Sequence, residues 1–520
     1  MPFRTALATA IDGIAERNGG WLLTGRHFFV ALALYVLVLF LIKGVLYSGG
    51  IGHDVDLLVK SQSFELGYDT RNPPLYTWLV IAAQVAFGVG LPAVLAVKSL
   101  MILSLYGFLY LSARRVLRDE ALAVVTAMAP FAMYEIGLWL AIKYSHTAAL
   151  AAACMVTLYA LLRLEESGKT LWYAVLGCVI GLGLLAKYNY AIFLVSLLGA
   201  GLFDAGLRGR LGDLRMLGTA AIALLIALPH ASWMVAQAAG FEDSATARFA
   251  MGTDHSWLAG LALGWASALK ATLNMLVPLA LAVPLLYWRA SRTGVSGDWP
   301  ARRTFRVLGI LLGLSVAAVF VLVAVSGSTR VRGQYLFILV PFPLWLAAWA
   351  QGLGLSRRAV NRIALAFTAL ALLTPVLMLG KYLSEPLTRD YPRYNLSYAG
   401  LARQLGDAGF REGTIYAFDY PYSLSGNLRP YFPAARILGS GVPHTRPPAR
   451  EVRGQCALIW AVDRKSVADR AMLESAQALL GFEGAAGSRL FEIEVAVENG
   501  RNRTVRFRIR LFPDGPGDCR

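Results

Sequence analysis

The sequence predicts a mainly α-helical protein, in which a polytopic bundle of membrane helices is followed by a smaller α/β domain. Of its 520 residues, 57% are hydrophobic and only 16% are charged, and the mean hydropathy is +0.54. These values are too apolar for an ordinary soluble domain. Apolar runs long enough to cross about 30 Å of hydrocarbon recur from Phe28 to Gly380. From Lys381 onward the sequence is polar with short β-like runs, which predicts one soluble domain.

Basic loops between the apolar runs predict the orientation of the helices, because short cytoplasmic loops are rich in Lys and Arg. The arginines that mark these loops are Arg114, Arg115, Arg118, Arg208, Arg210, Arg215, Arg289, Arg292, Arg302, Arg303, Arg357, Arg358 and Arg362. About eleven spans fit this pattern and leave the C-terminus outside. They are 27–47, 92–113, 120–140, 147–164, 171–186, 190–206, 215–235, 271–288, 305–326, 335–353 and 363–380.

We therefore expect a multi-pass protein of the bacterial inner membrane with three parts. These are a cytoplasmic segment 1–26 without a signal peptide, a transmembrane domain 27–380 and a periplasmic α/β domain 381–520. The net charge of +17 lies largely in the orienting loops, so the expected surroundings are a lipid bilayer and not nucleic acid. Cys456 and Cys519 both fall in the last part, where an oxidising compartment would permit a disulfide, and their pairing stays open.

The first predicted outer loop, residues 48–91, is long for a connection between two membrane helices. Long ordered loops usually carry function. Its apolar part, 75–90, is expected to be a juxtamembrane helix, because a further crossing there would put the arginine-rich loop 114–118 outside. Near its start the loop contains Asp54 and Asp56. Paired carboxylates can chelate a divalent cation or share a proton, whereas the alternative is a solvated acidic loop.

The run DVDLLVKSQSFELGY, followed by NPPLYTWL, resembles the first outer loop of the family 39 glycosyltransferases, which include protein mannosyltransferases and the lipid A aminoarabinose transferase. GLGLLAKYNYAIFL and RVRGQYLFILVPFPLWL resemble two later stretches of that family. The resemblance covers most of residues 45–350 and implies a fold of the GT-C superfamily. The sequence departs from the family at Val55 in place of a second acid, at Ser145, His146 and Thr147 in place of a Thr-Asp-Ala run, and by one inserted residue between Tyr68 and Pro73.

The resemblance implies transfer of a sugar from a polyprenyl phosphate, which needs a base for the acceptor hydroxyl and positive charge beside the departing phosphate. Asp54 and Asp56 are the candidate catalytic residues, with Asp54 as the base of an inverting reaction. Cations on the outer side are candidate phosphate ligands: Arg330, Arg332, Lys187, Arg71 and Lys60. The matching motifs imply substrate contacts at Tyr68, Asn72, Tyr335 and His146.

A divalent metal is a candidate cofactor, with Asp54, Asp56 and His53 as its ligands. His255 is also predicted at the outer face, but the spacing of the histidines fits no compact metal motif. Ordinary interfacial histidines are the alternative.

The C-terminal part predicts strands at TIYAFDY, ARILG and CALIWAV, a helix at SVADRAMLESAQALL and a final hairpin with an Asn-Gly turn. None of these runs resembles a catalytic motif. We expect this domain to cover the membrane cavity or to shape access of the acceptor.

Taken together, these patterns favour an inner-membrane glycosyltransferase with a polyprenyl-phosphate sugar donor and a periplasmic acceptor. A flippase or transporter would need polar residues along several helix interiors, which are scarce. A polymerase or ligase of envelope glycans would carry its large loop late in the chain. A non-catalytic assembly subunit is a third alternative. The sugar stays open, and the acceptor can be lipid A, another glycolipid or a protein hydroxyl.

Overall fold

The computed structural model describes residues 23–50, 52–237, 257–287, 299, 301–388, 395–420, 423–443, 445, 447–448, 454–462, 469–482, 484, 486–500 and 502–519. Most of the predicted segment 1–26, together with His255, Arg289 and Arg292, lies outside these residues. The chain forms two compact units. The first comprises 1–37, 70–75 and 98–374, and the second comprises 38–69, 76–97 and 375–520. The predicted domain bounds at 380 and 381 stay a prediction.

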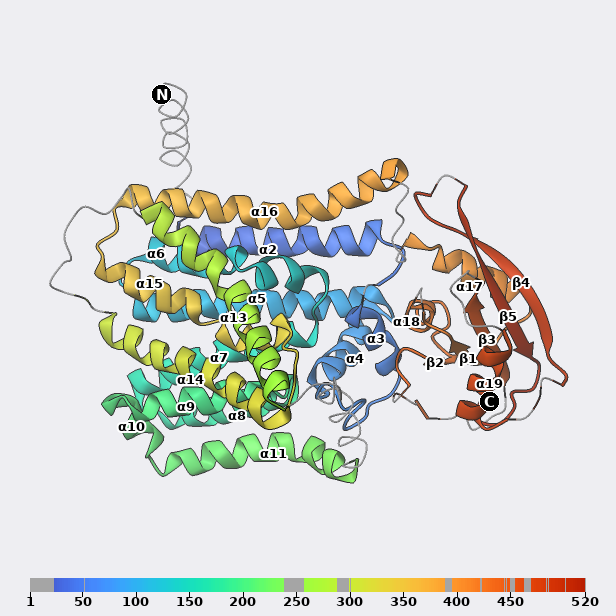
Figure 1. Cartoon of the computed structure of the whole chain (residues 1–520), viewed down its shortest axis with the longest axis horizontal. Coiled ribbons are helices and arrows are strands. Elements are labelled where there is room, and N and C mark those ends of the chain that lie inside the picture. The colour runs from blue at the N-terminus through green and yellow to red at the C-terminus, as the bar shows by residue number, and fades with distance from the viewer. Residues whose placement is uncertain are drawn as a thin grey trace, which may run out of the picture. The chain divides into compact units, whose positions relative to one another are not determined.

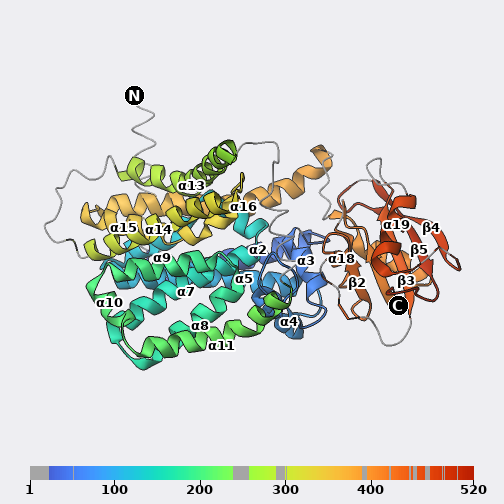
Figure 2. The same ribbon diagram turned by 60° about the horizontal axis from the view of Figure 1, so that its bottom comes forward.

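The first unit is a helical bundle around one large apolar core. Helix α8 lies between α7 and α11, and α9 packs against α7 and α14 (Figures 1 and 2). The close approach of α8 and α11 depends on Gly177 and Gly181. A Cβ at Gly177 would lie 2.7 Å from the carbonyl oxygen of Thr219, and one at Gly181 would lie 2.8 Å from the Cβ of Ile226. Small residues of this kind let membrane helices pack backbone against backbone.

The helices that lie wholly or mainly in the first unit follow the predicted apolar runs. They are α2 (Gly25–Leu41), α5 (Leu91–Val116), α6 (Glu120–Met128), η2 (Ala129–Ala132), η3 (Glu135–Leu140), α7 (His146–Ser167), α8 (Thr170–Ala186), α9 (Tyr190–Leu202), α10 (Ala205–Leu211), α11 (Arg215–Ala236), α13 (Trp257–Tyr287), α14 (Arg302–Ser326), η4 (Gly333–Leu339), α15 (Phe342–Gly352) and α16 (Arg357–Thr388).

Seven of the described helices are long and apolar enough to cross a membrane, or nine if the bent pairs α9–α10 and η4–α15 each count as one span. The polytopic helical architecture is therefore confirmed, whereas the number of about eleven spans stays a prediction. Two predicted spans differ from the helices of the structure. The predicted span 120–140 is broken after α6 by the 3-10 turn Ala129–Ala132, which contains Pro130 and is followed by the π-helical η3. Helix α13 begins at Trp257, well before the predicted 271, because the preceding residues are also good helix formers.

The second unit contains a five-stranded mixed sheet in the order β2-β1-β3-β5-β4 (Figure 1). Strand β1 pairs in parallel with β2 and β3, and β5 pairs antiparallel with β3 and β4. Alternate residues of β1 point to opposite faces, so Ile415 joins the core under α17 and α18, and Tyr416 joins the core under α19. The elements are β1 (Gly413–Ala417), β2 (Arg436–Gly439), β3 (Gln455–Ala461), β4 (Arg489–Ala496), β5 (Thr504–Phe512), α17 (Tyr398–Asp407), α18 (Leu424–Leu428) and α19 (Asp469–Leu480).

The predicted α/β character of the C-terminal part is thus confirmed, including the final hairpin. Asn499 has φ of 65°, as expected for an Asn-Gly turn. A disulfide joins Cys456 of β3 to Cys519. The same unit contains three elements from the beginning of the chain: the π-helical η1 (Ile42–Leu46), α3 (His53–Lys60) and α4 (Leu75–Phe87). The predicted juxtamembrane segment is therefore helical from its first residue.

Candidate functional site

Asp54 is the second residue of α3, and its side chain is completely buried. The helix begins after Gly52, whose backbone (φ 56°, ψ −126°) is accessible to glycine at little cost but strained for other residues. The Nζ of Lys43, in η1, donates a hydrogen bond to Oδ2 of Asp54 at 2.8 Å, and only 2% of the Lys43 side chain is exposed. A buried carboxylate and a buried ammonium therefore neutralise each other at the start of α3.

Asp56 has a different environment, although it is only two residues away. Its carboxylate is partly exposed and lies 3.7 Å from Nδ1 of His53. Across the described ranges, no three His, Cys, Asp or Glu side chains come close enough together to hold a metal ion. The predicted metal site formed by Asp54, Asp56 and His53 is therefore not present, because Asp54 turns inward to Lys43 while Asp56 turns to His53. We assign none of the three a ligand role.

A third carboxylate faces this region from the C-terminal sheet. Asp419 follows β1 and accepts hydrogen bonds from the backbone N–H groups of Ser425, at 2.8 Å, and Gly441, at 2.9 Å. Burial raises the pKa of Asp419 to about 6, and the negative charge of Asp56 adds to the rise. Asp419 thus ties the start of α18 to the loop after β2, and its charge is coupled to that of Asp56.

Helix α3 is attached to the C-terminal domain at both ends, to α18 before the helix and to β2 after it. Before the helix, the backbone N–H of Gly50 donates to Oδ1 of Asn427 in α18 at 2.7 Å. After it, Gln62 forms a pair of 2.8 Å hydrogen bonds with the backbone N–H and carbonyl of Ile437 in β2. Between these points α18 packs on α3, at Gly426. The C-terminal domain therefore fixes the backbone that carries Asp54.

Two predicted residues of the first loop have structural partners. Lys60, at the end of α3, forms a buried ion pair with Asp69. The hydroxyl of Tyr68 donates to the carbonyl of Ser63 at 2.9 Å, and burial raises the pKa of Tyr68 to about 12. Both side chains hold the loop together, so we carry neither forward as a substrate or phosphate ligand.

The first unit gathers a second set of predicted residues around Lys187, the residue after α8. Its Nζ donates to Oγ1 of Thr147 in α7 at 2.6 Å and lies 5.8 Å from the ring centre of Tyr335. Asn189 donates to the backbone carbonyl of Tyr335 at 2.9 Å, which holds η4 beside the α8–α9 turn. His146 is buried next to Thr147, at the start of α7. Lys187, Tyr335 and His146 are thus brought into one neighbourhood.

Arginines 330 and 332 lie in the loop that leads into η4, and both are exposed. Ser328 holds this loop through a hydrogen bond from its hydroxyl to the carbonyl of Arg330 at 3.1 Å. Arg332 interacts electrostatically with Tyr144, whose hydroxyl donates to Glu135 at 3.2 Å. Cations and hydrogen-bonding groups therefore meet at the end of the bundle that is predicted to face the periplasm.

Arg71 is exposed and Asn72 is partly exposed, both in the short segment 70–75 that belongs to the first unit. Asp54 and Asp56 belong to the second unit. The predicted residues thus form two groups, one in each unit.

Sequence reasoning missed two cations. Lys43 is a lysine at the predicted outer end of the first span, so it broke the positive-inside pattern as clearly as Lys187 did. Lys143, exposed and stacked 5.5 Å from the ring centre of Trp139, carried the same signal between two predicted spans. No sequence pattern indicated that Asn427 binds the backbone before α3, because its partner Gly50 is 377 positions away in the sequence.

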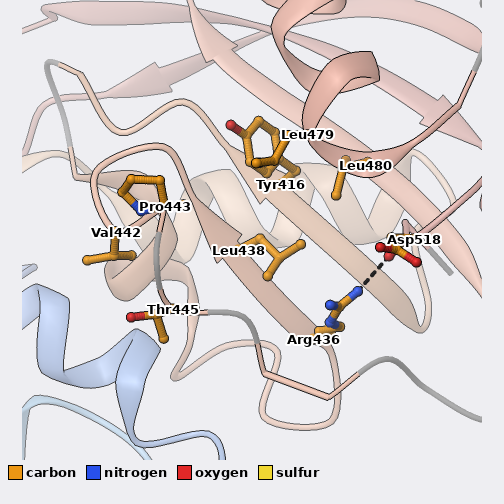
Figure 3. A pocket seen from close by; sticks show the side chains of 10 residues that line it. Tyr416, Arg436, Leu438, Val442, Pro443, Thr445, Leu479, Leu480 and Asp518 are labelled. Carbon is orange, nitrogen blue, oxygen red and sulfur yellow. Dashed lines mark hydrogen bonds between the residues drawn. The ribbon is translucent and has the colours of Figure 1, made fainter. Parts of the chain in front are cut away.

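The C-terminal domain also contains a small pocket (Figure 3). Its walls are mostly apolar, with Leu438 and Val442 on one side and Leu480 on another. Its cation, Arg436, donates to the backbone carbonyl of Asp518 and is largely buried. Because the guanidinium is used to fasten the C-terminal segment, we assign this pocket no part in the chemistry.

Comparison with known proteins shows one matching protein family, two similar enzymes and a solved structure with a similar fold. Residues 71–233 match the family described as dolichyl-phosphate-mannose-protein mannosyltransferase. The chain is 29% identical to the lipopolysaccharide core galacturonosyltransferase RgtA of Rhizobium johnstonii, over 81% of this chain and 85% of that protein. It is 28% identical to RgtB of the same organism, over 79% and 83%. The crystal structure of ArnT from Cupriavidus metallidurans bound to undecaprenyl phosphate has a similar fold, with a TM-score of 0.59 at 16% identity, over 95% of this chain and 98% of that one.

Proposed function

We propose that this chain, a membrane glycosyltransferase similar to those of family 39, transfers a galacturonosyl residue from a polyprenyl phosphate to a lipopolysaccharide core. The observation that carries the proposed sugar and acceptor is the 29% identity, over 81% of this chain, to an enzyme named as a lipopolysaccharide core galacturonosyltransferase. The proposed lipid-phosphate donor is supported by the similar fold of ArnT, whose structure contains undecaprenyl phosphate. The transporter and assembly-subunit alternatives are not carried forward, since the chain is an enzyme. The proposed acceptor is a glycolipid, one of the acceptor classes that the sequence left open.

The charges of the first unit support a donor with more than one negative group. Arg330, Arg332 and Lys143 are exposed and Lys187 is buried beside Tyr335. A uronic acid linked to a lipid phosphate carries a sugar carboxylate in addition to the phosphate. Arginine suits bidentate contact with either group. We therefore propose Arg330 and Arg332 as ligands of the donor and Lys187 as the cation nearest the leaving phosphate.

Asp54 is the proposed base, because it belongs to the loop that resembles the catalytic loop of the family. The carboxylate is covered in this structure, so the acceptor reaches it only when the side chains that cover it move. Catalytic contacts often form only in the substrate complex. Asp56 is the alternative base, with better access.

The proposed step is a single inverting displacement. The acceptor hydroxyl loses its proton to the carboxylate of Asp54, and its oxygen forms a bond to the anomeric carbon of the sugar. The bond between that carbon and the phosphate oxygen breaks, and its electron pair leaves with the lipid phosphate. The reaction thus requires no oxidant and no further co-reactant.

The bacterial inner membrane is the proposed location, with the C-terminal domain in the periplasm. The disulfide between Cys456 and Cys519 supports this location, because disulfides persist in oxidising compartments and are rare in the cytosol.

The test is transfer by the purified protein from undecaprenyl-phosphate galacturonic acid to lipopolysaccharide that lacks core galacturonic acid, followed by mass spectrometry of the product. Donors carrying glucose, which is neutral, or aminoarabinose, which carries an amine, serve as comparisons. We expect transfer of the uronic acid and at least about 10-fold lower kcat/KM with either comparison donor, because neither offers the carboxylate with which an arginine pairs. Faster transfer of glucose or of aminoarabinose would contradict the proposed donor.

The base is tested with Asp54→Asn and Asp56→Asn, which keep the size of each side chain. Loss of a general base lowers turnover by about 10²–10⁴-fold, so we expect that loss for Asp54→Asn and a smaller one for Asp56→Asn. Normal turnover of Asp54→Asn together with an inactive Asp56→Asn would assign the base to Asp56.

A further inference from the structure

Lys43 is a buried lysine in the π-helical end of the first membrane helix. The segment η1 continues α2 from Ile42 to Leu46. A π-turn contains an extra residue relative to an α-helix and thereby redirects the side chains around it, and such turns are frequent at functional sites. In this case the redirected side chain is Lys43, whose ammonium reaches Asp54, eleven residues later in the sequence.

The stability of the folded protein does not by itself explain the Lys43–Asp54 ion pair. Each charge loses hydration when it is buried, and replacing a buried ion pair by well-packed apolar residues often leaves stability unchanged or higher. Both side chains are almost fully covered, at 2% and 0% exposure, so neither recovers hydration at the surface. The ion pair at the start of α3 is therefore better explained by a catalytic role, in which the carboxylate of Asp54 has to be ionised and held in one orientation.

The backbone of α3 is already fixed by other contacts. Asn427 holds Gly50 before the helix, and Ile437 holds Gln62 after it. With the backbone fixed, the remaining freedom of Asp54 is rotation of its side chain. The hydrogen bond from Lys43 to Oδ2 restricts that rotation.

We propose that Lys43 is the positioning residue of the catalytic carboxylate. This inference rests on the proposed role of Asp54 as the base. Lys43 engages Oδ2 and supplies the counter-charge that keeps the carboxylate ionised, and Oδ1 takes the proton of the acceptor hydroxyl. The proton accepted by Asp54 is later released to water.

The experiment compares Lys43→Met, Lys43→Arg, Asp54→Asn and the double variant Lys43→Met/Asp54→Asn in the purified full-length enzyme. Turnover and both KM values are measured on the monodisperse fraction. We expect Lys43→Met to lower kcat by about 10–10²-fold with little change in the donor KM, since misplacement of a catalytic group affects the transition state most. Lys43→Arg keeps the charge and should recover part of the loss. The double variant should be no slower than Asp54→Asn alone.

Lys60→Met is the matched control. Like Lys43, Lys60 is a buried lysine paired with an aspartate, but it lies at the end of α3 and its partner is Asp69. Lys60→Met is expected to lower thermal stability while kcat of the folded fraction stays within about 2-fold. A purely structural role of Lys43 predicts the same behaviour for Lys43→Met.

Three results would overturn the inference about Lys43: an unchanged kcat in Lys43→Met, a raised donor KM with normal kcat, or a double variant clearly slower than Asp54→Asn. The second would instead make Lys43 a ligand of the donor phosphate. If Lys43→Met does not fold, the double variant decides, since it removes both charges together. Normal turnover of Asp54→Asn is a different failure, because it would refute the base itself whatever Lys43 does.

Discussion

Gly426 of α18 occupies the position where the C-terminal domain touches the helix that carries Asp54. A Cβ on Gly426 would overlap with the carbonyl oxygen and the Cγ1 of Val55, the residue between the two acids. The carbonyl belongs to the backbone and cannot rotate away as a flexible side chain could. Gly426→Ala should therefore push α18 and α3 apart.

The expected magnitude follows from two opposing terms. Overpacking a tight contact costs about 1–3 kcal/mol, and replacing glycine by alanine within a helix returns roughly 1 kcal/mol. The net loss of up to about 2 kcal/mol leaves most of the protein folded. A catalytic group displaced by about 1 Å can lose about 10²-fold in rate. Turnover of Gly426→Ala should thus fall by about 10–10²-fold, well beyond its effect on stability.

The assay is galacturonosyl transfer at saturating donor, together with thermal unfolding of the same preparation. Gly406→Ala in α17 is the matched control, because a Cβ there has no neighbour within 4 Å. It should unfold at the same or a slightly higher temperature and keep normal turnover. Wild-type turnover in Gly426→Ala would refute the view that α18 sets the position of Asp54.

Arg332→Ala is expected to raise the apparent donor KM by about 10-fold or more. This factor corresponds to the free energy of one lost hydrogen bond between charged groups. Lys60→Ala should leave the donor KM unchanged. Equal donor KM values would remove Arg332 from the phosphate site. Because burial raises the pKa of Asp419 to about 6 from 3.8, the folded state binds more protons than the unfolded state across that interval. Stability of the C-terminal domain should therefore fall as pH rises from 3.8 to about 6 and then level off, and Asp419→Asn should flatten the profile. Hydrogen exchange of β1 in the full-length protein, corrected for intrinsic rates, measures this; a wild-type profile as flat as that of the variant would contradict the assignment. A periplasm-specific reporter fused at the C-terminus should be active, and Cys456 and Cys519 should react with thiol reagents on intact cells only after reduction. An inactive reporter on a stable protein would overturn the predicted topology.

The sequence was sufficient for the helical membrane architecture and the α/β character of the C-terminal part. Both follow from local patterns: apolar runs that can span a bilayer, and alternating runs such as CALIWAV that form strands. The sequence also contained a possible cause for the break of the predicted span 120–140, because Pro130 removes a backbone N–H from the helical hydrogen bonds. Pro229 and Pro375 nevertheless lie inside continuous helices, so the proline alone did not decide the break. The predicted acids and cations also needed no tertiary information, since they depend on short motifs and on charges that oppose the positive-inside rule.

Only the tertiary structure decided which partner each of these residues has. The sequence made Asp54 and Asp56 a pair, whereas the fold separates them, since one meets Lys43 and the other meets His53. Two positions along a helix correspond to a rotation of about 200°, so Asp54 and Asp56 point to opposite sides of α3 although they are close in the sequence.

The attachment of α3 to the C-terminal domain was equally invisible in the sequence. Gln62 and Ile437 are 375 positions apart, and their hydrogen bonds involve a backbone amide and carbonyl that every residue type provides. Such bonds impose no residue pattern on the chain. The sequence by itself therefore determined which elements form and which charges are available, whereas the packing of distant segments decided which carboxylate is buried against a lysine and what holds it there.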